Sequence, residues 1–360
     1  MLDVSIAGQR FTSRVEKRRR RHRDPPKRRL AVPPSLPLGS ADMDLVPVVS
    51  IDNPGATSLA DLDRACRDHG FFLLDGHGLD QIIAESFEAS KRFFGADRSV
   101  KNAIRRDAAN PLGYNERELT KRRRDHKEVF DFVDPTQGLA SRYNRWPDGV
   151  EGLREAMAAH YDACSDLAAR TTELVFAALG LTDDSAAAHR GDRRTSNMRL
   201  NHYTLDDPVP EDERDGLAEL GEVALGHHTD LGLLTLLIQD DVGGLQARSG
   251  EHGWIDVEPR PGTIVVNLAD CMQVWTNDRY RAAVHRVLPM TVRTRISIPY
   301  FFNPDRDAVI EPIAELAAEG PRYRPFAFRQ FIDARGADNY ADAGAPDTQI
   351  SDFRLAGDLL

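Results

Sequence analysis

The chain has 360 residues, 41% of them hydrophobic and 29% charged, which is typical of one large or two ordinary globular domains and not of a disordered or fibrous protein. Its net charge of −10 is unevenly distributed, because residues 1–43 carry +7 and the rest of the chain −17. An acidic body repels phosphate backbones, so nucleic-acid binding is disfavoured. No apolar run approaches the roughly eighteen residues of a membrane span, and the basic, proline-rich start argues against a secretory signal.

The three cysteines, Cys66, Cys164 and Cys271, form no CxxC pair and are odd in number. Neither a disulfide framework nor a thiolate metal site is therefore indicated. We expect a protein of the reducing cytoplasm, and a monomeric one.

Residues 1–43 contain "KRRRRHRDPPKRR" followed by a Pro/Ser run, without apolar periodicity. This composition predicts a disordered basic arm. Three interpretations stay open: a solvated tail, a nuclear-localisation or nucleic-acid patch, and a start codon placed too early, with Met43 as the real initiator.

Residues 44–195 are predicted to form a mixed, largely helical region that packs on the outside of the core. Apolar residues at three- and four-residue steps predict helices over 58–69, from about 80 to 94, and over 153–180. Short strands are expected at "LVPVVSID" and "FFLLDGHG". The region contains no Gly/Ser-rich linker, so we expect no separate domain here.

Residues 196–305 are rich in short β runs broken by Gly, Pro, Asn and Asp, which is typical of a sandwich or barrel. Residues 306–360 return to helix-like and coil sequence and are expected to cover this core. The β runs are "MRLNHYTL", "LLTLLIQD", "GLQAR", "WIDVEP", "TIVVNL", "HRVLPM" and "RISIPYFF".

His228 and Asp230 are separated by one residue in "GHHTDLGLLTLLIQD". On a strand, residues two apart project from the same face, so both side chains would point into one cavity, and His285 could join them from a later strand. Two imidazoles and one carboxylate on one side of a metal suit Fe(II) oxygen chemistry. The pair alone is a weak signal, because a buried His–Asp pair is often purely structural.

Arg295 and Ser297 lie two apart on a predicted strand, ten residues after His285. A guanidinium and a hydroxyl on one face can bind a carboxylate through parallel hydrogen bonds. Arg295 by itself would more often form an ordinary surface salt bridge. Beside the HxD pair and the distal histidine, however, a carboxylate clamp in the same cavity is favoured.

From Val46 to Phe331 these residues resemble the isopenicillin N synthase-like family of 2-oxoglutarate- and iron(II)-dependent oxygenases. The matching landmarks include "GFFLLDGHG", "DHKEVFDF", "LLTLLIQDDVGGLQ" and "PGTIVVNLAD". The resemblance implies that the iron ligands are His228, Asp230 and His285. It also assigns the cosubstrate contacts to the family's RxS and N-x-Y motifs, which here are Arg295, Ser297, Asn201 and Tyr203.

Other polar residues are given less weight. His227 should point away from the metal if His228 points toward it, and His69, His77, His160 and His202 are expected to be capping or packing residues. The basic run "TKRRRD" at 120–125 could contact an anionic substrate, although a solvated loop is favoured.

The family resemblance implies a double-stranded β-helix, a jelly-roll of two facing sheets, with flanking helices. It implies an enzyme that uses Fe(II), 2-oxoglutarate and O2 to oxidise a small organic molecule, with release of succinate and CO2. The expected substrate class is a secondary metabolite, as in antibiotic biosynthesis. An oxidase of the isopenicillin N synthase type, which needs no 2-oxoglutarate, is an alternative. A non-catalytic metal- or acid-binding jelly-roll and a zinc hydrolase are others. The sequence does not identify the substrate.

Overall fold

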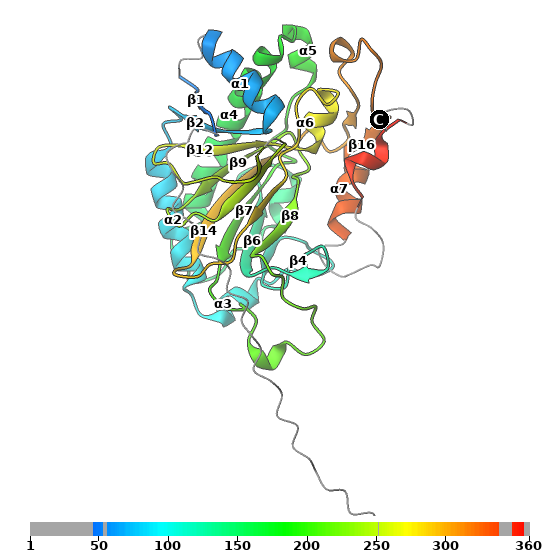
Figure 1. Ribbon diagram of the computed structural model, residues 1–360. Coiled ribbons are helices and arrows are strands. Elements are labelled where there is room, and N and C mark those ends of the chain that lie inside the picture. The colour runs from blue at the N-terminus through cyan, green and yellow to red at the C-terminus, as the bar shows by residue number, and fades with distance from the viewer. Residues whose placement is uncertain (1–45, 53–55, 251, 338–347, 356–360) are drawn as a thin grey trace, which may run out of the picture. The chain divides into compact units, whose positions relative to one another are not determined.

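A large sheet and a smaller sheet pack against each other in the computed structural model (Figure 1). The structure describes residues 46–52, 56–250, 252–337 and 348–355. The described residues belong to one compact unit. The basic arm predicted for residues 1–43 lies outside the described residues, and none of the described helices is long and apolar enough to cross a membrane.

The larger sheet has eight strands, which are antiparallel except for the parallel pair β1 and β2. In spatial order they are β1 (Val48–Ser50), β2 (Phe71–Asp75), β12 (Ile264–Leu268), β9 (Leu234–Gln239), β14 (Arg295–Phe302), β7 (Asn197–Tyr203), β6 (Lys127–Val133) and β3 (Gly113–Asn115).

The smaller sheet has four antiparallel strands and forms the second layer. Its order is β11 (Gly253–Asp256), β10 (Leu245–Ser249), β13 (His285–Val287) and β8 (Leu225–His228). The two-sheet arrangement is the jelly-roll that the sequence predicts.

Side chains on the two faces of the large sheet belong to two separate hydrophobic clusters. In β12, Ile264, Val266 and Leu268 belong to the cluster beneath the helices, whereas Val265 belongs to the cluster between the sheets. Because strand side chains alternate in direction, one strand contributes to both layers.

Helices cover the outer side of the large sheet, where Figure 1 shows α2 and α4 beside it. The 27-residue helix α4 contacts β9 and β14 and buries one side along its whole length, including Met157, Cys164 and Phe176. Helix α1 ends before Gly70, whose φ of 71° is the left-handed conformation that glycine adopts easily. The long helices are α1 (Ala56–Asp68), α2 (Asp80–Phe94) and α4 (Leu153–Leu179).

Shorter elements complete the described fold. They are the helices α3 (Arg98–Ala103), α5 (Asp183–Ala188), α6 (Asp270–Trp275) and α7 (Phe328–Ala337), the hairpin of β4 (Leu119–Thr120) and β5 (Arg123–Arg124), and the pair β15 (Val309–Ile310) and β16 (Phe326–Ala327). The 3-10 turns are η2 (Leu139–Tyr143), η3 (Glu211–Glu213), η4 (Ala314–Leu316) and η5 (Ile350–Phe353). All three predicted long helices are present within two residues of their expected ends, and every predicted β run is a strand. The large sheet also takes four strands, β1, β2, β3 and β6, from residues 44–195; the predicted boundaries between that range and its neighbours stay predictions.

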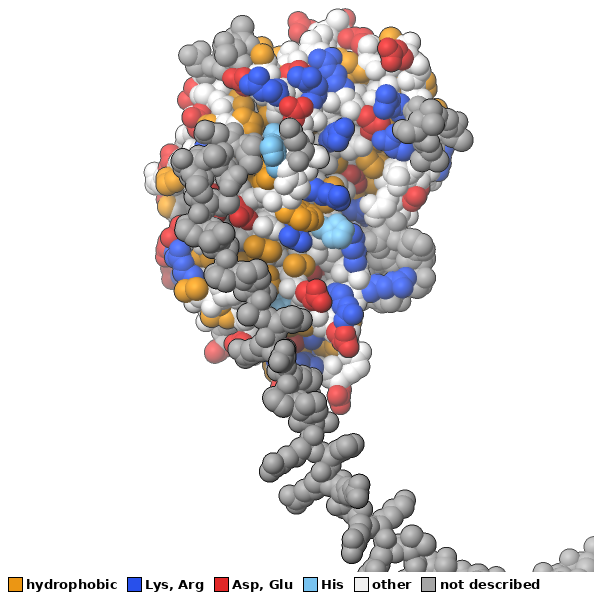
Figure 2. All heavy atoms as spheres, in the orientation of Figure 1, with side chains coloured by type: hydrophobic (Ala, Val, Ile, Leu, Met, Phe, Trp, Pro, Cys, Tyr) orange, Lys and Arg blue, Asp and Glu red, His pale blue; other side chains and the backbone are white. Residues whose placement is uncertain are grey.

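Charged side chains of both signs lie on the described surface. Figure 2 shows basic and acidic side chains interspersed with apolar ones over one face of the molecule. Many of them form ion pairs, such as Arg329 with Asp307 and Arg306 with Asp333. Opposite charges that lie close together contribute little to the electrostatic potential at a distance. The potential near these ion pairs is therefore weaker than the net charge of residues 44–360 alone would suggest.

Candidate metal centre

The smaller sheet brings two of the predicted ligands together. His228 is the last residue of β8 and His285 the first of β13, and the antiparallel register makes them direct neighbours. Their ring centroids are 4.3 Å apart. With Asp230 they form a group whose possible ligand atoms all lie within 4.8 Å of one another, the only such group of three or more among the residues that the structure describes.

Asp230 reaches this group differently from the way the sequence suggested. The expectation was that His228 and Asp230 share a strand, but β8 ends at His228 and Asp230 lies in the loop that follows. Hydrogen bonds orient its carboxylate instead: Oδ2 accepts from Thr235 Oγ1 at 2.5 Å and from Asn267 Nδ2 at 2.8 Å. The other oxygen, Oδ1, lies 3.7 Å from His228 Nε2 and 3.9 Å from His285 Nε2.

Both histidines are oriented by backbone carbonyls. The Nδ1 atom of His228 is 2.9 Å from the oxygen of Gly226, and Nδ1 of His285 is 2.9 Å from the oxygen of Ala283. A carbonyl can only accept, so each Nδ1 carries the proton and donates it. The Nε2 lone pairs are then free to bind a metal, which is the usual arrangement of metal-binding histidines.

The electrostatics of the group also favour metal binding. Burial, and then the neighbouring His285, lower the pKa of His228 to about 3, so this imidazole is neutral at physiological pH. Burial alone would raise the pKa of Asp230, but the two imidazoles and the hydrogen bonds from Thr235 and Asn267 outweigh it and lower the pKa. Two imidazole nitrogens and one carboxylate oxygen therefore face one point, which fits a divalent metal of the iron type.

The predicted carboxylate clamp lies on the large sheet, on the side that faces the smaller sheet. Cross-strand neighbours are Arg295 with Tyr203 and Ser297 with Asn201, so all four side chains share one face. The Arg295 guanidinium lies 5.0 Å from the centre of the Tyr203 ring. Asn201 Nδ2 is 3.5 Å from Ser297 Oγ, at the limit of a hydrogen bond. The structure thus brings all four predicted residues together.

Arg295 is the feature of the clamp that most clearly points to a ligand. Its side chain is fully buried, and Nη2 donates to Gln239 Oε1 at 3.0 Å. Its Nε and Nη1 atoms have no hydrogen-bond partner among the described residues. Leaving N–H groups of a buried charge unpaired is costly, so an anion with two oxygens, such as a carboxylate, fits the site.

Three further residues orient members of the two groups and were not singled out in the sequence. Thr235 and Asn267 orient Asp230, and Gln239 orients Arg295. Their sequence signal is a polar residue at alternate positions of an otherwise apolar strand, as in "LLTLLIQ" and "TIVVNL".

A buried lysine beside the clamp was also missed. Lys127 is the cross-strand neighbour of Tyr203 on β6, and its Nζ lies 2.9 Å from Glu118 and 3.6 Å from Asp125. Two carboxylates thus compensate its charge, which favours a structural role.

Four of the other histidines that the structure describes lie away from the metal group. His227 is exposed on the opposite side of β8 from His228, where its Nε2 is 2.5 Å from Lys121 Nζ. His77 accepts a hydrogen bond from the backbone of residue 79, His160 is fully buried beside Ser86, and His202 contacts Glu128.

Two arginines of the basic run at 120–125 form ion pairs with carboxylates from the segment that follows β7. Arg123 pairs with Glu219, and the buried Arg124 makes two hydrogen bonds of 2.8 Å to Asp207. These contacts favour a structural role for the two arginines over anion binding. All three cysteines are free and buried.

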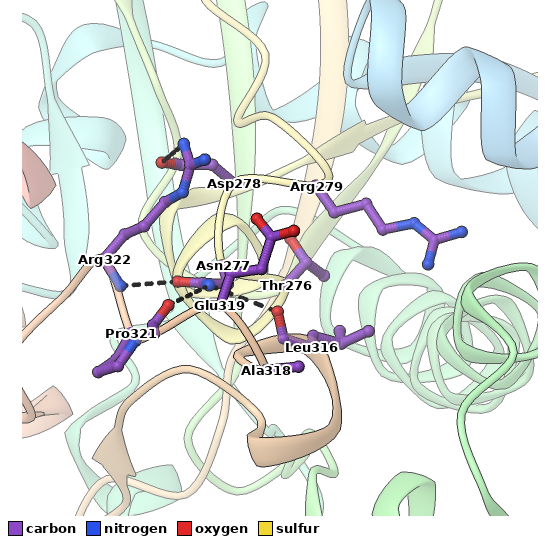
Figure 3. A pocket seen from close by; sticks show the side chains of 10 residues that line it. Thr276, Asn277, Asp278, Arg279, Leu316, Ala318, Glu319, Pro321 and Arg322 are labelled. Atoms are coloured by element: carbon purple, nitrogen blue, oxygen red, sulfur yellow. Dashed lines mark hydrogen bonds and ion pairs between the residues drawn. The ribbon is translucent and has the colours of Figure 1, made fainter. Parts of the chain in front are cut away.

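A cavity of about 440 Å³ lies elsewhere, after the C-terminal end of α6. Figure 3 shows its polar lining and the hydrogen bond of 2.8 Å from the Arg322 backbone N–H to Asn277 Oδ1. Asn277 and Asp278 both have positive φ, 51° and 66°, in the turn that forms one wall. No residue of the metal group or of the clamp lines this cavity.

Two family models match the chain. The model of the 2OG-Fe(II) oxygenase superfamily matches residues 194–304, which include all seven predicted site residues. A model described as the N-terminal region of non-haem dioxygenases in morphine synthesis matches residues 45–149.

Similar proteins agree with these matches. Gibberellin 3-beta-dioxygenase 4 of Arabidopsis thaliana is 30% identical over 303 residues, 81% of this chain and 81% of the relative. The 2-oxoglutarate-Fe(II) type oxidoreductase hxnY of Emericella nidulans is 30% identical over 345 residues, 88% and 95% of the two chains. A Neurospora crassa protein, whose crystal structure was solved in complex with alpha-KG, is 25% identical, with a TM-score of 0.68 over 81% of this chain and 96% of that one.

The chain therefore belongs to the 2OG-Fe(II) oxygenase superfamily and is an Fe(II)- and 2-oxoglutarate-dependent dioxygenase with a jelly-roll core.

Proposed function

We propose that His228, Asp230 and His285 bind the catalytic Fe(II). The observation that carries this assignment is the convergence of two Nε2 atoms and one carboxylate oxygen within 4.8 Å, with both Nδ1 atoms turned to backbone carbonyls. Three protein ligands on one side leave positions open for other molecules, and the bound iron supplies the activation of O2. The protein's part is to hold these three side chains at fixed positions.

The second part of the proposal assigns the cosubstrate site. Arg295 donates from Nη1, which has no partner among the described residues, to a carboxylate of 2-oxoglutarate, and the hydroxyl of Ser297 donates a further hydrogen bond. Tyr203 contributes its phenol, and Asn201 holds Ser297 in place. Burial excludes water from these contacts and strengthens them.

The substrate is a small organic molecule, and we propose a secondary metabolite. The names of the relatives include a gibberellin 3-beta-dioxygenase and a homoarginine-6-hydroxylase. Both names refer to small organic molecules, which supports this class of substrate, but the two molecules differ, so no single compound is indicated. We also propose that the protein acts as a monomer in a reducing cytoplasm, which three free, buried thiols support.

The test of the site is an anaerobic titration. The Fe(II) protein is titrated with 2-oxoglutarate and followed by visible absorbance, and iron stoichiometry is measured for the Ala variants of His228, Asp230 and His285. The wild type is expected to bind one iron and to develop a metal-to-ligand absorption band. Asp241→Ala is the matched control, because this carboxylate is exposed and paired with Arg293.

Two results would contradict the proposal. Full iron binding in two or more of the ligand variants would show that the metal lies elsewhere. A wild type that binds iron but shows no band, and releases no succinate in air, would leave the iron site and remove the cosubstrate assignment.

A further inference from the structure

The C-terminal helix α7 contacts the loop that carries the metal group. Arg335, in its last turn, is half-buried, and its Nη2 atom donates a hydrogen bond of 3.2 Å to the backbone oxygen of Thr229. Its Nη1 atom donates to the backbone oxygen of Thr348 at 3.2 Å and to Gln349 Oε1 at 2.8 Å. One guanidinium thus joins three separate segments of the chain.

Thr229 is the residue between His228 and Asp230. It lies outside β8, so no strand pairing fixes its backbone. The following residues are held by α6 instead: the backbone N–H of Asp270 donates to the oxygen of Asp230 at 2.9 Å, and that of Cys271 to the oxygen of Leu231 at 3.3 Å. Arg335 supplies the corresponding contact at Thr229 itself, from a different element.

The hydrogen bonds to Thr348 and Gln349 fix the orientation of the Arg335 guanidinium. A planar guanidinium with two of its nitrogens engaged has little freedom to turn, so its hydrogen bond to Thr229 resists a shift of that carbonyl. The two ligands on either side of Thr229 move with its backbone.

We propose that Arg335 is a positioning residue of the metal centre, which fixes the carbonyl of Thr229 and thereby the spacing of His228 and Asp230. The inference rests on the proposed iron site. It makes the C-terminal helix a functional part of the centre, in addition to a cover for the core.

The experiment compares Arg335→Ala, Arg335→Gln and Arg335→Lys with Arg329→Ala. Arg329 lies on the same helix, but its side chain is about half exposed and pairs with Asp307 at the surface, so it is a matched control. Fe(II) affinity is measured by anaerobic titration of the full chain, and hydrogen exchange is measured on the metal-free protein. Removing a residue that orients metal ligands typically weakens metal binding about 10- to 100-fold.

We expect Arg335→Ala to show a loss of this size and faster exchange in residues 226–231 of the metal-free protein, with β9 and β14 unchanged. Lysine, which retains the charge but not the fork, should restore part of the affinity. Arg329→Ala should match the wild type in both measurements.

Wild-type iron affinity in both Arg335→Ala and Arg335→Gln would overturn the inference. So would equal losses in Arg335→Ala and Arg329→Ala, or faster exchange throughout the chain, since either would indicate general destabilisation. A wild type that binds no iron would instead contradict the proposed function, so the two failures are distinguishable.

Discussion

The two sides of the large sheet are built by the same strands and differ in chemistry. Toward helices α2 and α4, β14 presents Ile296 and Ile298, which pack in the larger hydrophobic cluster. Toward the smaller sheet it presents Arg295 and Ser297, which are equally buried but polar. Alternation along a strand therefore lets one sheet serve as scaffold on one side and as binding wall on the other. We expect changes on the helix side to alter stability, and changes on the other side to alter ligand affinity.

The largest expected effect is on the helix side. Phe130 on β6 is fully buried and packs against the rings of Phe93, Phe132 and Trp146 at centroid distances of 5.0 to 5.7 Å. Phe130→Ala should lower the free energy of unfolding by about 3–5 kcal/mol through lost burial and a cavity, measured by urea denaturation. The affinity of the folded variant for 2-oxoglutarate should stay unchanged. Tyr143→Ala, at an exposed ring, is the control.

The helix side also contains a titratable residue. Burial lowers the pKa of His160 to about 4, from an ordinary value of 6.5, and its Nε2 has no hydrogen-bond partner among the described residues. Between about pH 6.5 and 4, His160 is protonated in the unfolded chain but neutral in the folded one. The free energy of unfolding therefore falls as pH drops through this range. The total loss is roughly 3 kcal/mol.

His160→Gln should remove this part of the pH dependence. The measurement is urea denaturation of both proteins at several pH values between 4 and 7. If the difference between the two unfolding free energies did not change over that window, His160 would not be the source of the acid sensitivity.

On the binding side, Arg295→Ala should raise the dissociation constant of 2-oxoglutarate about 10- to 150-fold, which corresponds to the loss of roughly 1.5–3 kcal/mol from a charge-assisted contact. Arg295→Lys should restore only part of the affinity, because the ammonium lacks the fork. Anaerobic titration measures both. Arg293→Ala, near the start of the same strand but exposed and paired with Asp241, should bind as the wild type does.

The smallest effect is expected from removing the basic arm, which belongs to neither side of the large sheet. A chain that starts at Met43 should keep the melting temperature and activity of the full-length protein, because residues 1–43 contain too few apolar groups to pack. A fall of several degrees in melting temperature, measured by calorimetry, would show that the arm contacts the folded unit.

Much of the fold could be predicted because its signals are periodic. The helix over 153–180 and the strands around "TIVVNL" and "RISIPYFF" follow from spacing alone, and the structure contains them within a few residues. No periodic pattern predicts the strands β3 and β6, although "DHKEVFDF", which contains β6, is a landmark of the family resemblance. Lys127 and Asp131 on β6 are charged residues at inward positions, where a sequence pattern predicts apolar ones. Lys127 pairs with Glu118, and Asp131 pairs with Arg199, 68 positions away, so the second partner is supplied by tertiary packing.

The sequence indicates which side chains form the candidate site, and the structure brings them together, but the sequence does not give the contacts that orient them. His228, Asp230 and His285 were singled out, yet the reason given for Asp230 was a shared strand, whereas hydrogen bonds from Thr235 and Asn267 orient it. These bonds join residues 5 and 37 positions away in sequence. The contact of Arg335 with Thr229, 106 positions apart, is likewise a product of tertiary packing.

The position of β8 at the edge of the smaller sheet has a consequence for how the chain responds to iron. Among strands of that sheet, β8 pairs only with β13, and a register shift interrupts the pairing after His285. A metal held by β8, β13 and the loop after β8 would act as a cross-link at this weakly paired margin. Since a ligand that binds only the folded state stabilises it in proportion to the logarithm of its concentration, cellular iron would set how often this margin opens to proteases.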